Sequence, residues 1–260
     1  MHSKSGRRWH PNGYRQISLL NTYYKILARI LARRPKQVMA AQFQYTQFCG
    51  VPGNSILDAA SQIRDRIAHA ENTGTPMCIL TLDFHNAFDH IVHEYTLAKL
   101  RNIARFHRPP TRNVQWRHWF SPNKRHSRRP HTDPMWCAAR LPLSMALYAL
   151  CLHPLLSRLN HSLQGPQVGR KRCRSVLAYA DNVTVFVTHP AEYVTIRQTI
   201  KWFEKATGAL LNPSKSKAMA FGGWTAPATD LGIAFHDSIK VLGVTLGRLY
   251  HKLWNTARQV

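Results

Sequence analysis

The most constraining feature of the chain is an apolar run from Val176 to Val187 that is interrupted by the polar pair Asp181-Asn182. The apolar alternation on both sides of this pair is typical of two short β-strands. Asp and Asn tolerate the backbone angles that a tight turn between strands requires. The sequence therefore predicts a β-hairpin that presents Asp181 at its tip.

A second strand is predicted upstream, where residues 78–82, apolar except for Thr81, lead directly into Asp83. Carboxylates at two strand ends can share divalent metal ions, and phosphoryl transfer uses two Mg²⁺ ions about 3.5–4 Å apart. Hard oxygen ligands suit Mg²⁺ better than His or Cys would. Taken singly, each motif also has a plainer interpretation, with Asp83 as the cap of a following helix and Asp181-Asn182 as turn residues.

Taken together and in order, these motifs and several others resemble the reverse transcriptases of non-LTR (LINE-type) retrotransposons. The two central motifs are Leu82-Asp-Phe-x-x-Ala-Phe-Asp89 and Tyr179-Ala-Asp-x. The other similar blocks are residues 14–31 (opening fingers motif), 46–56 (the next block), 143–150 (the helix after the template-contacting turn), 208–217 (the segment after the catalytic hairpin) and 241–244 (primer-grip strand). An ordered series of blocks is far more specific than one short motif.

The resemblance implies an α+β fold, a right-hand polymerase with fingers and a palm that carries an antiparallel catalytic sheet. The reverse transcriptase domain is expected over residues 14–249, with fingers at about 14–75, palm at about 76–103 and 141–249, and an aberrant segment at 104–140. The thumb is expected to be absent or truncated, so that the chain is a fragment of the family architecture. Residues 1–13, which are basic, and 250–260 are unassigned ends.

The implied reaction is RNA-directed DNA synthesis, in which two metal ions transfer deoxynucleotides to a primer 3′ end. Asp83 and Asp181 would be the metal ligands for Mg²⁺, with Mn²⁺ as a substitute, and Asn182 would be a degenerate catalytic position. Phe88 would exclude a ribose 2′-hydroxyl. The other implied contacts are Arg15, Lys25 and Lys215 for the nucleotide and Leu242 and Gly243 for the primer. A solvated helix face explains Lys25 equally well, and a surface position explains Lys215 or Lys217.

Two departures from the family pattern affect the expected activity. Asn182 stands where the family has a second Asp, and a neutral amide offers one carbonyl oxygen beside two divalent cations. The loss of such a group costs on the order of 10²–10³ in rate, and the alternative is that Asn182 is a tolerated variant. The Gln-Gly turn that precedes Pro-Leu-Ser in the family is also missing, and Arg140 would obstruct the close backbone approach that Gly allows.

The charge of the chain predicts a polyanionic partner. It has 36 Lys and Arg against 12 Asp and Glu, a formal net charge of +24. Phosphate neutralisation gives sequence-independent affinity that falls steeply with salt. The expected partners are an RNA template, a DNA primer and deoxynucleoside triphosphates. The alternative function is that of a non-enzymatic basic protein, a retrotransposon remnant that binds RNA or DNA.

The remaining sequence features concern compartment and helices. Five cysteines without C-x-x-C spacing, and no signal peptide, predict a reducing intracellular location, nuclear or cytoplasmic. The most apolar run, 141–156, is interrupted by Pro142, His153 and Pro154 and falls short of the roughly 20 residues of a membrane span, so it predicts a buried palm helix. On that helix Leu143, Leu147, Leu150, Cys151 and Leu155 are expected to face the strands that carry Asp83 and Asp181. Other helices are predicted at 21–32, 55–71, after Asp83 through Leu97, and 190–207.

The segment from about Ala104 to Arg140 is rich in Arg, His, Pro and Trp, has one acidic residue, Asp133, and shows no helical or strand period. A family-like Val-Arg-Gln-Gly-Cys-Pro, written GTG CGC CAG GGC TGC CCC, encodes Cys-Ala-Arg-Leu-Pro when it is read one base later and then loses one base. The chain reads Cys137-Ala-Ala-Arg-Leu-Pro142. We hypothesise out-of-frame translation between two indels, with a basic RNA-contacting loop as the alternative. Sequencing the gene tests this, and a shifted frame that recovers no family-like residues would sink it.

Overall fold

The computed structural model describes residues 2–3, 14–15, 21–23, 25–26, 28–30, 32–33, 43, 46–51, 53–85, 91–106, 142–225 and 231–247. Its helices are α2 (Ile56–Thr73), α3 (His93–Phe106), α4 (Pro142–Ser162) and α5 (Glu192–Thr207). The strands of the first part of the chain are β1 (His2–Ser3), β2 (Tyr14–Arg15) and β3 (Met77–Leu82). Those that follow α4 are β4 (Gln167–Val168), β5 (Lys171–Arg172), β6 (Val176–Tyr179), β7 (Asn182–Val187), β8 (Lys217–Phe221), β9 (Ser238–Val241) and β10 (Val244–Gly247). The described residues from Thr22 to Arg33 are also helical, as predicted.

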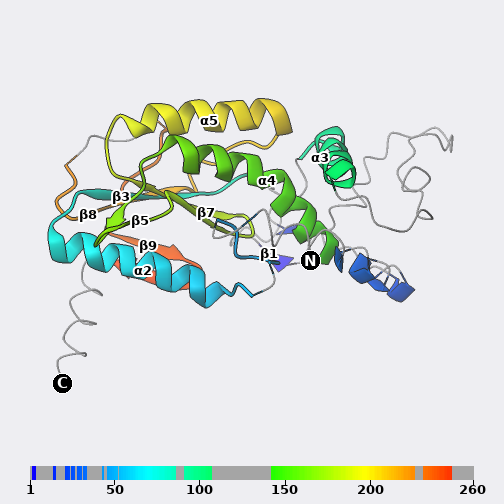
Figure 1. Ribbon diagram of the computed structural model, residues 1–260, viewed down its shortest axis with the longest axis horizontal. Helices are drawn as coiled ribbons and strands as arrows, with labels where there is room; N and C mark the ends of the chain where they lie inside the picture. Colours follow the sequence, from blue (N-terminus) through cyan, green and yellow to red (C-terminus); the bar gives the residue numbers. More distant parts are fainter. Residues whose placement is uncertain are drawn as a thin grey trace, which may run out of the picture.

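The centre of the structure is an antiparallel sheet of four strands in the order β6-β7-β3-β8 (Figure 1). Strand β3 lies inside this sheet, and its residues Met77 to Leu80 are buried. Burial on both faces explains why its sequence is a continuous apolar run rather than an alternating one. The α+β fold and the antiparallel sheet are therefore confirmed.

Both edges of the sheet are covered by other parts of the chain. Gln47 forms a parallel bridge with Ala178 of β6, and Phe235 forms one with Ala218 of β8. The Ala218 N–H donates to the Ala234 carbonyl, and the His236 N–H donates to the Ala218 carbonyl. Covered edges present no row of unpaired backbone groups to other chains.

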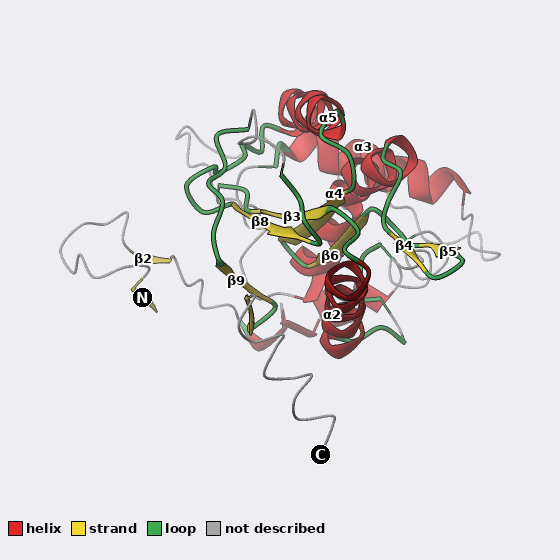
Figure 2. Ribbon diagram, turned by 90° about the vertical axis from the view of Figure 1, so that its left-hand side faces the viewer, coloured by secondary structure: helices red, strands yellow, loops and turns green. Residues whose placement is uncertain are grey.

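Helices and a hairpin cover the two faces of the sheet (Figures 1 and 2). One buried cluster joins α4 and α5 to the sheet residues Cys78, Leu80, Val183 and Val185. A second cluster joins α2 and the β9–β10 hairpin to the sheet residues Ile79, Leu177, Phe186 and Met219. Because successive strand residues point to opposite faces, neighbouring positions of β3 contribute to different clusters.

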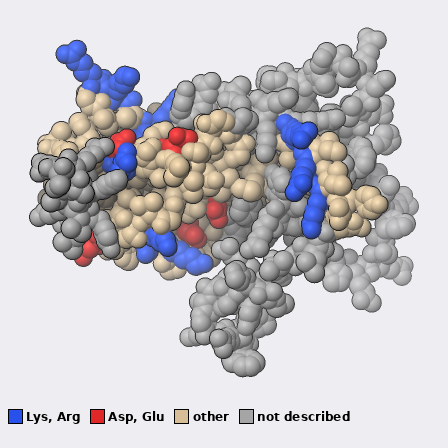
Figure 3. Space-filling view, turned by 90° about the horizontal axis from the view of Figure 1, so that it is seen from below, with Lys and Arg blue, Asp and Glu red and all other residues tan. Residues whose placement is uncertain are grey.

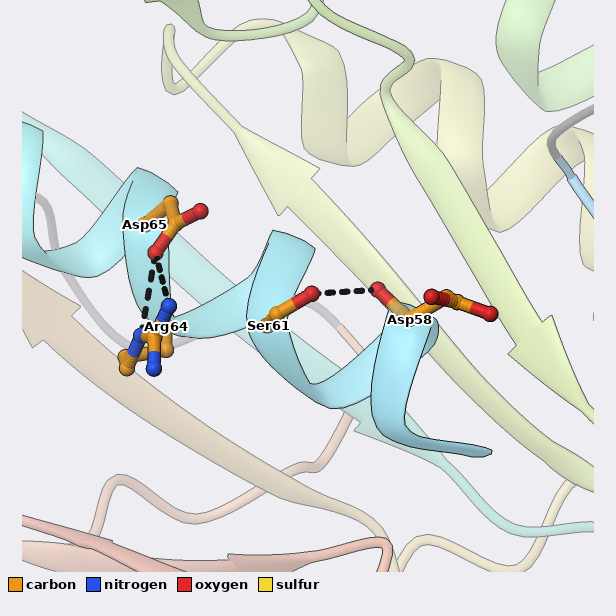
Figure 4. Close-up of polar contacts among 4 residues, drawn as sticks. All are labelled: Asp58, Ser61, Arg64 and Asp65. Carbon is orange, nitrogen blue, oxygen red and sulfur yellow. Dashed lines mark hydrogen bonds and ion pairs between the residues drawn. The ribbon is translucent and has the colours of Figure 1, made fainter. Parts of the chain in front are cut away.

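Helix α2 begins with a capping box, and of the two caps that the sequence offers, Asn54 and Ser55, the structure uses Ser55. Ser55 is the N-cap, its Oγ accepts from the Asp58 N–H at 3.2 Å, and the Asp58 carboxylate accepts from the Ser55 N–H at 2.8 Å. These bonds satisfy N–H groups that have no partner within the helix. Figure 4 shows the exposed side of this helix, where Ser61 donates to the Asp58 carbonyl and Arg64 forms an ion pair with Asp65 at 2.7 Å.

Two helices differ from the sequence-based expectation. Helix α3 continues to Phe106 rather than ending near Leu97. On α4, Cys151 and Leu155 pack on the sheet as predicted, but Leu147 and Leu150 belong to a separate cluster with Ala28, Ala32 and Phe43. Helix α4 is apolar around most of its circumference because it has neighbours on more than one side. The side chain of Leu143 lies outside the described residues.

No helix in the described parts of the chain combines the length and the apolar character that crossing a membrane requires.

The turn after β8 depends on a glycine. Gly222 has a φ of 57°, and a Cβ there would overlap the Thr75 carbonyl oxygen and lie 2.8 Å from the Ala70 carbonyl oxygen. Gly223 has a φ of 78°, but a Cβ there meets nothing closer than 4.0 Å. Both positions therefore require a positive φ, but only Gly222 lies against the backbone at the C-terminal end of α2.

We expect Gly222→Ala to lower the free energy of unfolding by about 2–5 kcal/mol, combining about 1–2 kcal/mol of backbone strain with about 1–3 kcal/mol of overpacking. Gly223→Ala is the matched control and should show the strain alone. Urea unfolding monitored by tryptophan fluorescence measures both. Equal losses for the two variants would contradict the packing assigned to Gly222.

Candidate active site

The predicted hairpin is formed by β6 and β7, with Tyr179 paired to Asn182 and a two-residue turn of Ala180 and Asp181 between them. Ala180 has a φ of 56°, a conformation that residues with a Cβ seldom adopt. Asp181 is half-buried and Asn182 is exposed. The turn therefore presents the Asp181 carboxylate at the end of the hairpin, as the sequence predicts.

Asp83 lies at the same end of the sheet because of the register between β3 and β7. Leu82 pairs with Val183, so the next position along β3, Asp83, lies across from Asn182. Asp83 is half-buried. Residues about a hundred positions apart in the sequence thus become neighbours through one antiparallel pairing.

The buried phenol of Tyr148 on α4 is coupled electrostatically to both carboxylates. Burial raises the pKa of Tyr148 far above its ordinary value, and the charges of Asp181, Cys151 and Asp83 add to the increase. Tyr148 is 4% exposed. One phenol within electrostatic reach of Asp83 and Asp181 is consistent with the two carboxylates sharing one site.

The backbone of Asp83 is held by the turn from Asn212 to Ser216. The Asp83 N–H donates to Ser216 Oγ at 3.0 Å, and the Asp83 carbonyl accepts from the Asn212 N–H at 2.8 Å. Ser216 is 2% exposed, and its own hydroxyl donates to the Asn212 carbonyl at 2.8 Å. The block after the catalytic hairpin therefore supports Asp83 through backbone bonds, which the motif pattern did not reveal.

The Asp181 turn is held in a similar way by Gln47. Its side chain accepts from the Ala180 N–H at 3.2 Å and donates to the Ala180 carbonyl at 3.3 Å. The side chain is fully buried. Sequence reasoning placed Gln47 inside a family-like block without assigning it a role, and no sequence signal indicated one, because its burial and its partner 133 positions away are visible only in the structure.

The two described non-glycine residues with positive φ both lie at hairpin tips of this region. They are Ala180 and Leu242, which has a φ of 51°. Leu242 and Gly243 form the turn between β9 and β10, with positive φ at both, as in the I′ turns that favour hairpins. The predicted primer-grip strand is thus a hairpin tip. Such strain costs about 1–3 kcal/mol per residue and is concentrated at functional sites.

The other predicted contacts are less informative. Lys25 is exposed on the helical segment near the N-terminus, and Lys215 is exposed in the turn that holds Asp83. Arg15 lies in β2, paired through its backbone with His2. Phe88, Arg140 and the position of the missing Gln-Gly turn lie outside the described residues. The roles of all these residues stay predictions.

The oxygen atoms at this end of the sheet suit hard cations, but one of the three side chains that offer them is neutral. Asp83 and Asp181 supply carboxylate oxygens, and Asn182 supplies one neutral carbonyl oxygen. Among the described residues, no group of three or more His, Cys, Asp and Glu side chains gathers into a metal site. The arrangement can hold a divalent cation between two strand ends, with one negative charge fewer than three carboxylates would give.

An antiparallel sheet with carboxylates at two adjoining strand ends, backed by two helices, defines the palm of a nucleic-acid polymerase. The profile of the family described as reverse transcriptase (RNA-dependent DNA polymerase) matches residues 2–246, and the chain belongs to that family. The resemblance drawn from the motifs is therefore confirmed. Family membership also carries the coarser expectations of divalent metals and a nucleic-acid template.

The chain is also similar to two known proteins. It is 30% identical over 258 residues to the "Transposon TX1 uncharacterized 149 kDa protein" of Xenopus laevis, covering 90% of this chain and 18% of that protein. Telomerase from Candida albicans, solved in complex with a fragment of telomeric RNA, aligns with a TM-score of 0.52 and 13% identity, covering 86% of this chain and 36% of that chain. The second likeness shows the fold. The chain spans well under two thirds of both relatives.

Ser216→Ala should lower the free energy of unfolding by about 1–3 kcal/mol, because the Asp83 N–H loses its buried acceptor. Ser214→Ala is the matched control, since Ser214 is exposed and donates to the Asn212 side chain at 2.8 Å. We expect the control to stay within about 0.5 kcal/mol of the parent. Chemical denaturation of both variants measures the difference, and equal effects would show that Ser216 does not support Asp83.

Proposed function

We propose that this chain is the reverse transcriptase domain of a non-LTR retrotransposon, with RNA-directed DNA polymerase activity strongly impaired at Asn182. The observation that carries the proposal is the register of β3 and β7, which brings Asp83 beside the turn that bears Asp181. The ordered motifs, the family match and the transposon relative support it. The substrates would be an RNA template, a DNA primer and deoxynucleoside triphosphates.

Each site residue has a proposed part in this reaction. Asp83 and Asp181 would hold Mg²⁺, which when bound activates the primer hydroxyl and stabilises the leaving pyrophosphate. Phe88 would exclude a ribose 2′-hydroxyl. Leu242 and Gly243, at the β9–β10 tip, would contact the primer. The cationic side chains proposed to contact the incoming nucleotide are Arg15, Lys25 and Lys215.

Asn182 is the reason to propose impaired rather than full activity. It lies across from Asp83 and next to Asp181, so its lack of charge would act at the proposed metal site itself. A neutral amide attracts a divalent cation less strongly than a carboxylate does. Weaker metal binding would lower the rate at every nucleotide addition.

Primer extension on an RNA template in Mg²⁺ tests the proposal. Asn182→Asp should extend the primer on the order of 10²–10³ times faster than the parent chain. Adding Asp83→Ala to Asn182→Asp should abolish extension, whereas adding Asp65→Asn, an exposed carboxylate on α2, should leave it. A parent chain as fast as Asn182→Asp would overturn the impairment, and no extension by Asn182→Asp would overturn polymerase activity in this chain.

The second candidate function is nucleic-acid binding without catalysis, and the distribution of charge favours it. Arg170, Lys171, Arg172 and Arg174 are exposed on and beside the β4–β5 hairpin, and no ion pair joins them to any described residue. Figure 3 shows Lys and Arg side chains at several separate places on one face, with Asp and Glu side chains between some of them. Unpaired cations on a protruding hairpin can bind phosphates whatever Asn182 does.

Combining Lys171→Gln with Arg172→Gln should weaken binding to a single-stranded RNA and flatten its salt dependence by about 0.7 in the log–log slope for each lost phosphate contact. Lys201→Gln with Lys205→Gln, two exposed cations on α5, is the charge-matched control. Fluorescence anisotropy over a series of salt concentrations measures both. A hairpin variant with the parent slope would contradict this candidate, as would an equal change in the control.

A further inference from the structure

Gln47 belongs to the segment that extends the sheet beyond β6. The Phe48 N–H donates to the Ala178 carbonyl at 2.9 Å, and the Ala178 N–H donates to the Thr46 carbonyl at 2.7 Å. The Gln47 carbonyl accepts from the Asn54 side chain at 3.4 Å, next to the Ser55 cap of α2. The backbone of Gln47 is therefore anchored on two sides, to the sheet and to the start of a helix.

The orientation of the Gln47 amide follows from its partners. Oε1 accepts from two backbone N–H groups, those of Cys49 at 3.1 Å and Ala180 at 3.2 Å, while Nε2 donates to the Ala180 carbonyl at 3.3 Å. Exchanging the oxygen and nitrogen would place donors against donors and an acceptor against an acceptor. The side chain therefore bonds both backbone groups of Ala180 as a neighbouring strand would.

These bonds fall on the residue of the turn that has an unfavourable backbone conformation. Ala180 has a φ of 56° and directly precedes Asp181. A residue with a Cβ holds such an angle only when its surroundings determine it. The buried amide of Gln47 supplies two hydrogen bonds that a relaxed Ala180 would lose.

We propose that Gln47 is a positioning residue that holds the Ala180–Asp181 turn in the conformation presenting Asp181 to a divalent cation. The inference rests on the proposed function in taking Asp181 as a metal ligand, and it deepens that function by naming what holds the ligand in place. Gln47 touches neither substrate nor metal and acts through the backbone of Ala180.

The test uses the Asn182→Asp chain as background and measures Mn²⁺ affinity by electron paramagnetic resonance, with Asp83→Ala to identify binding at this site. Adding Gln47→Leu should weaken Mn²⁺ binding about 10–100-fold, as the loss of partners that orient ligands does elsewhere. Adding Asn160→Ala is the matched control. The Asn160 side chain accepts from the Ser175 N–H at 3.2 Å, just before β6 and at the opposite end of that strand from the turn.

A second substitution separates positioning from a general loss of stability. Glycine adopts a positive φ without the penalty that Ala180 carries. Adding Ala180→Gly to Gln47→Leu should therefore recover part of the Mn²⁺ affinity. In the Asn160→Ala chain the same substitution relieves the same strain but should leave the Mn²⁺ affinity unchanged, because the turn there still has its Gln47 bonds. Unchanged affinity in Gln47→Leu, an equal loss in Asn160→Ala, or no recovery by Ala180→Gly would each overturn the proposal.

Hydrogen exchange gives a readout that depends on neither metal nor catalysis. The Ala180 amide should exchange at least about tenfold faster in Gln47→Leu. Loss of a hydrogen bond that stabilises the folded turn by about 1.4 kcal/mol makes opening of the turn about ten times more frequent. Asn160→Ala should leave it unchanged. The two proposals can therefore fail separately. Absence of Mn²⁺ binding at this site in Asn182→Asp would overturn the proposed function. An unchanged exchange rate of the Ala180 amide in Gln47→Leu would overturn the role of Gln47, whatever the result with Mn²⁺.

Discussion

The antiparallel pairing of β3 with β7 is the interaction on which the rest of the structure depends. Its register aligns Leu82 with Val183, and this single alignment brings Asp83 to the hairpin turn. A shift by one residue would move every side chain of β3 to the opposite face of the sheet. The two apolar clusters resist such a shift, because alternate β3 residues are buried against α4 and α5 on one face and against α2 on the other.

The two carboxylate positions are supported by buried polar groups from distant segments: the Ser216 hydroxyl, the Asn212 main-chain N–H and the Gln47 side chain. Ser216 and Asn212 hold the backbone of Asp83, and Gln47 holds Ala180 beside Asp181. Buried polar groups that are fully paired restrict a structure to one arrangement, since leaving them unpaired is costly. The family-like blocks around residues 47 and 212 therefore have a physical role even though neither carries a catalytic group.

The two functions proposed for the chain require charges of opposite sign. The proposed catalysis requires concentrated negative charge at the end of the sheet, to which the neutral Asn182 contributes none. Nucleic-acid binding requires exposed positive charge, which the β4–β5 hairpin retains. A chain with a net charge of +24 can lose the first property and keep the second, because the groups involved lie on different elements.

The sequence by itself determined the elements and the motif order: the hairpin at 176–187, the helix at 55–71, the buried helix within 141–156 and the two carboxylates. Local periodicity, turn chemistry and capping carry that information, because they depend on neighbours in the chain. Only the tertiary structure decided that Asp83 lies across from Asn182, that Leu147 and Leu150 pack in a cluster separate from the sheet, and that Gln47 and Ser216 hold the site. Strand register, the sharing of a helix between two clusters and bonds across more than a hundred residues arise from packing between distant segments, which no local pattern records.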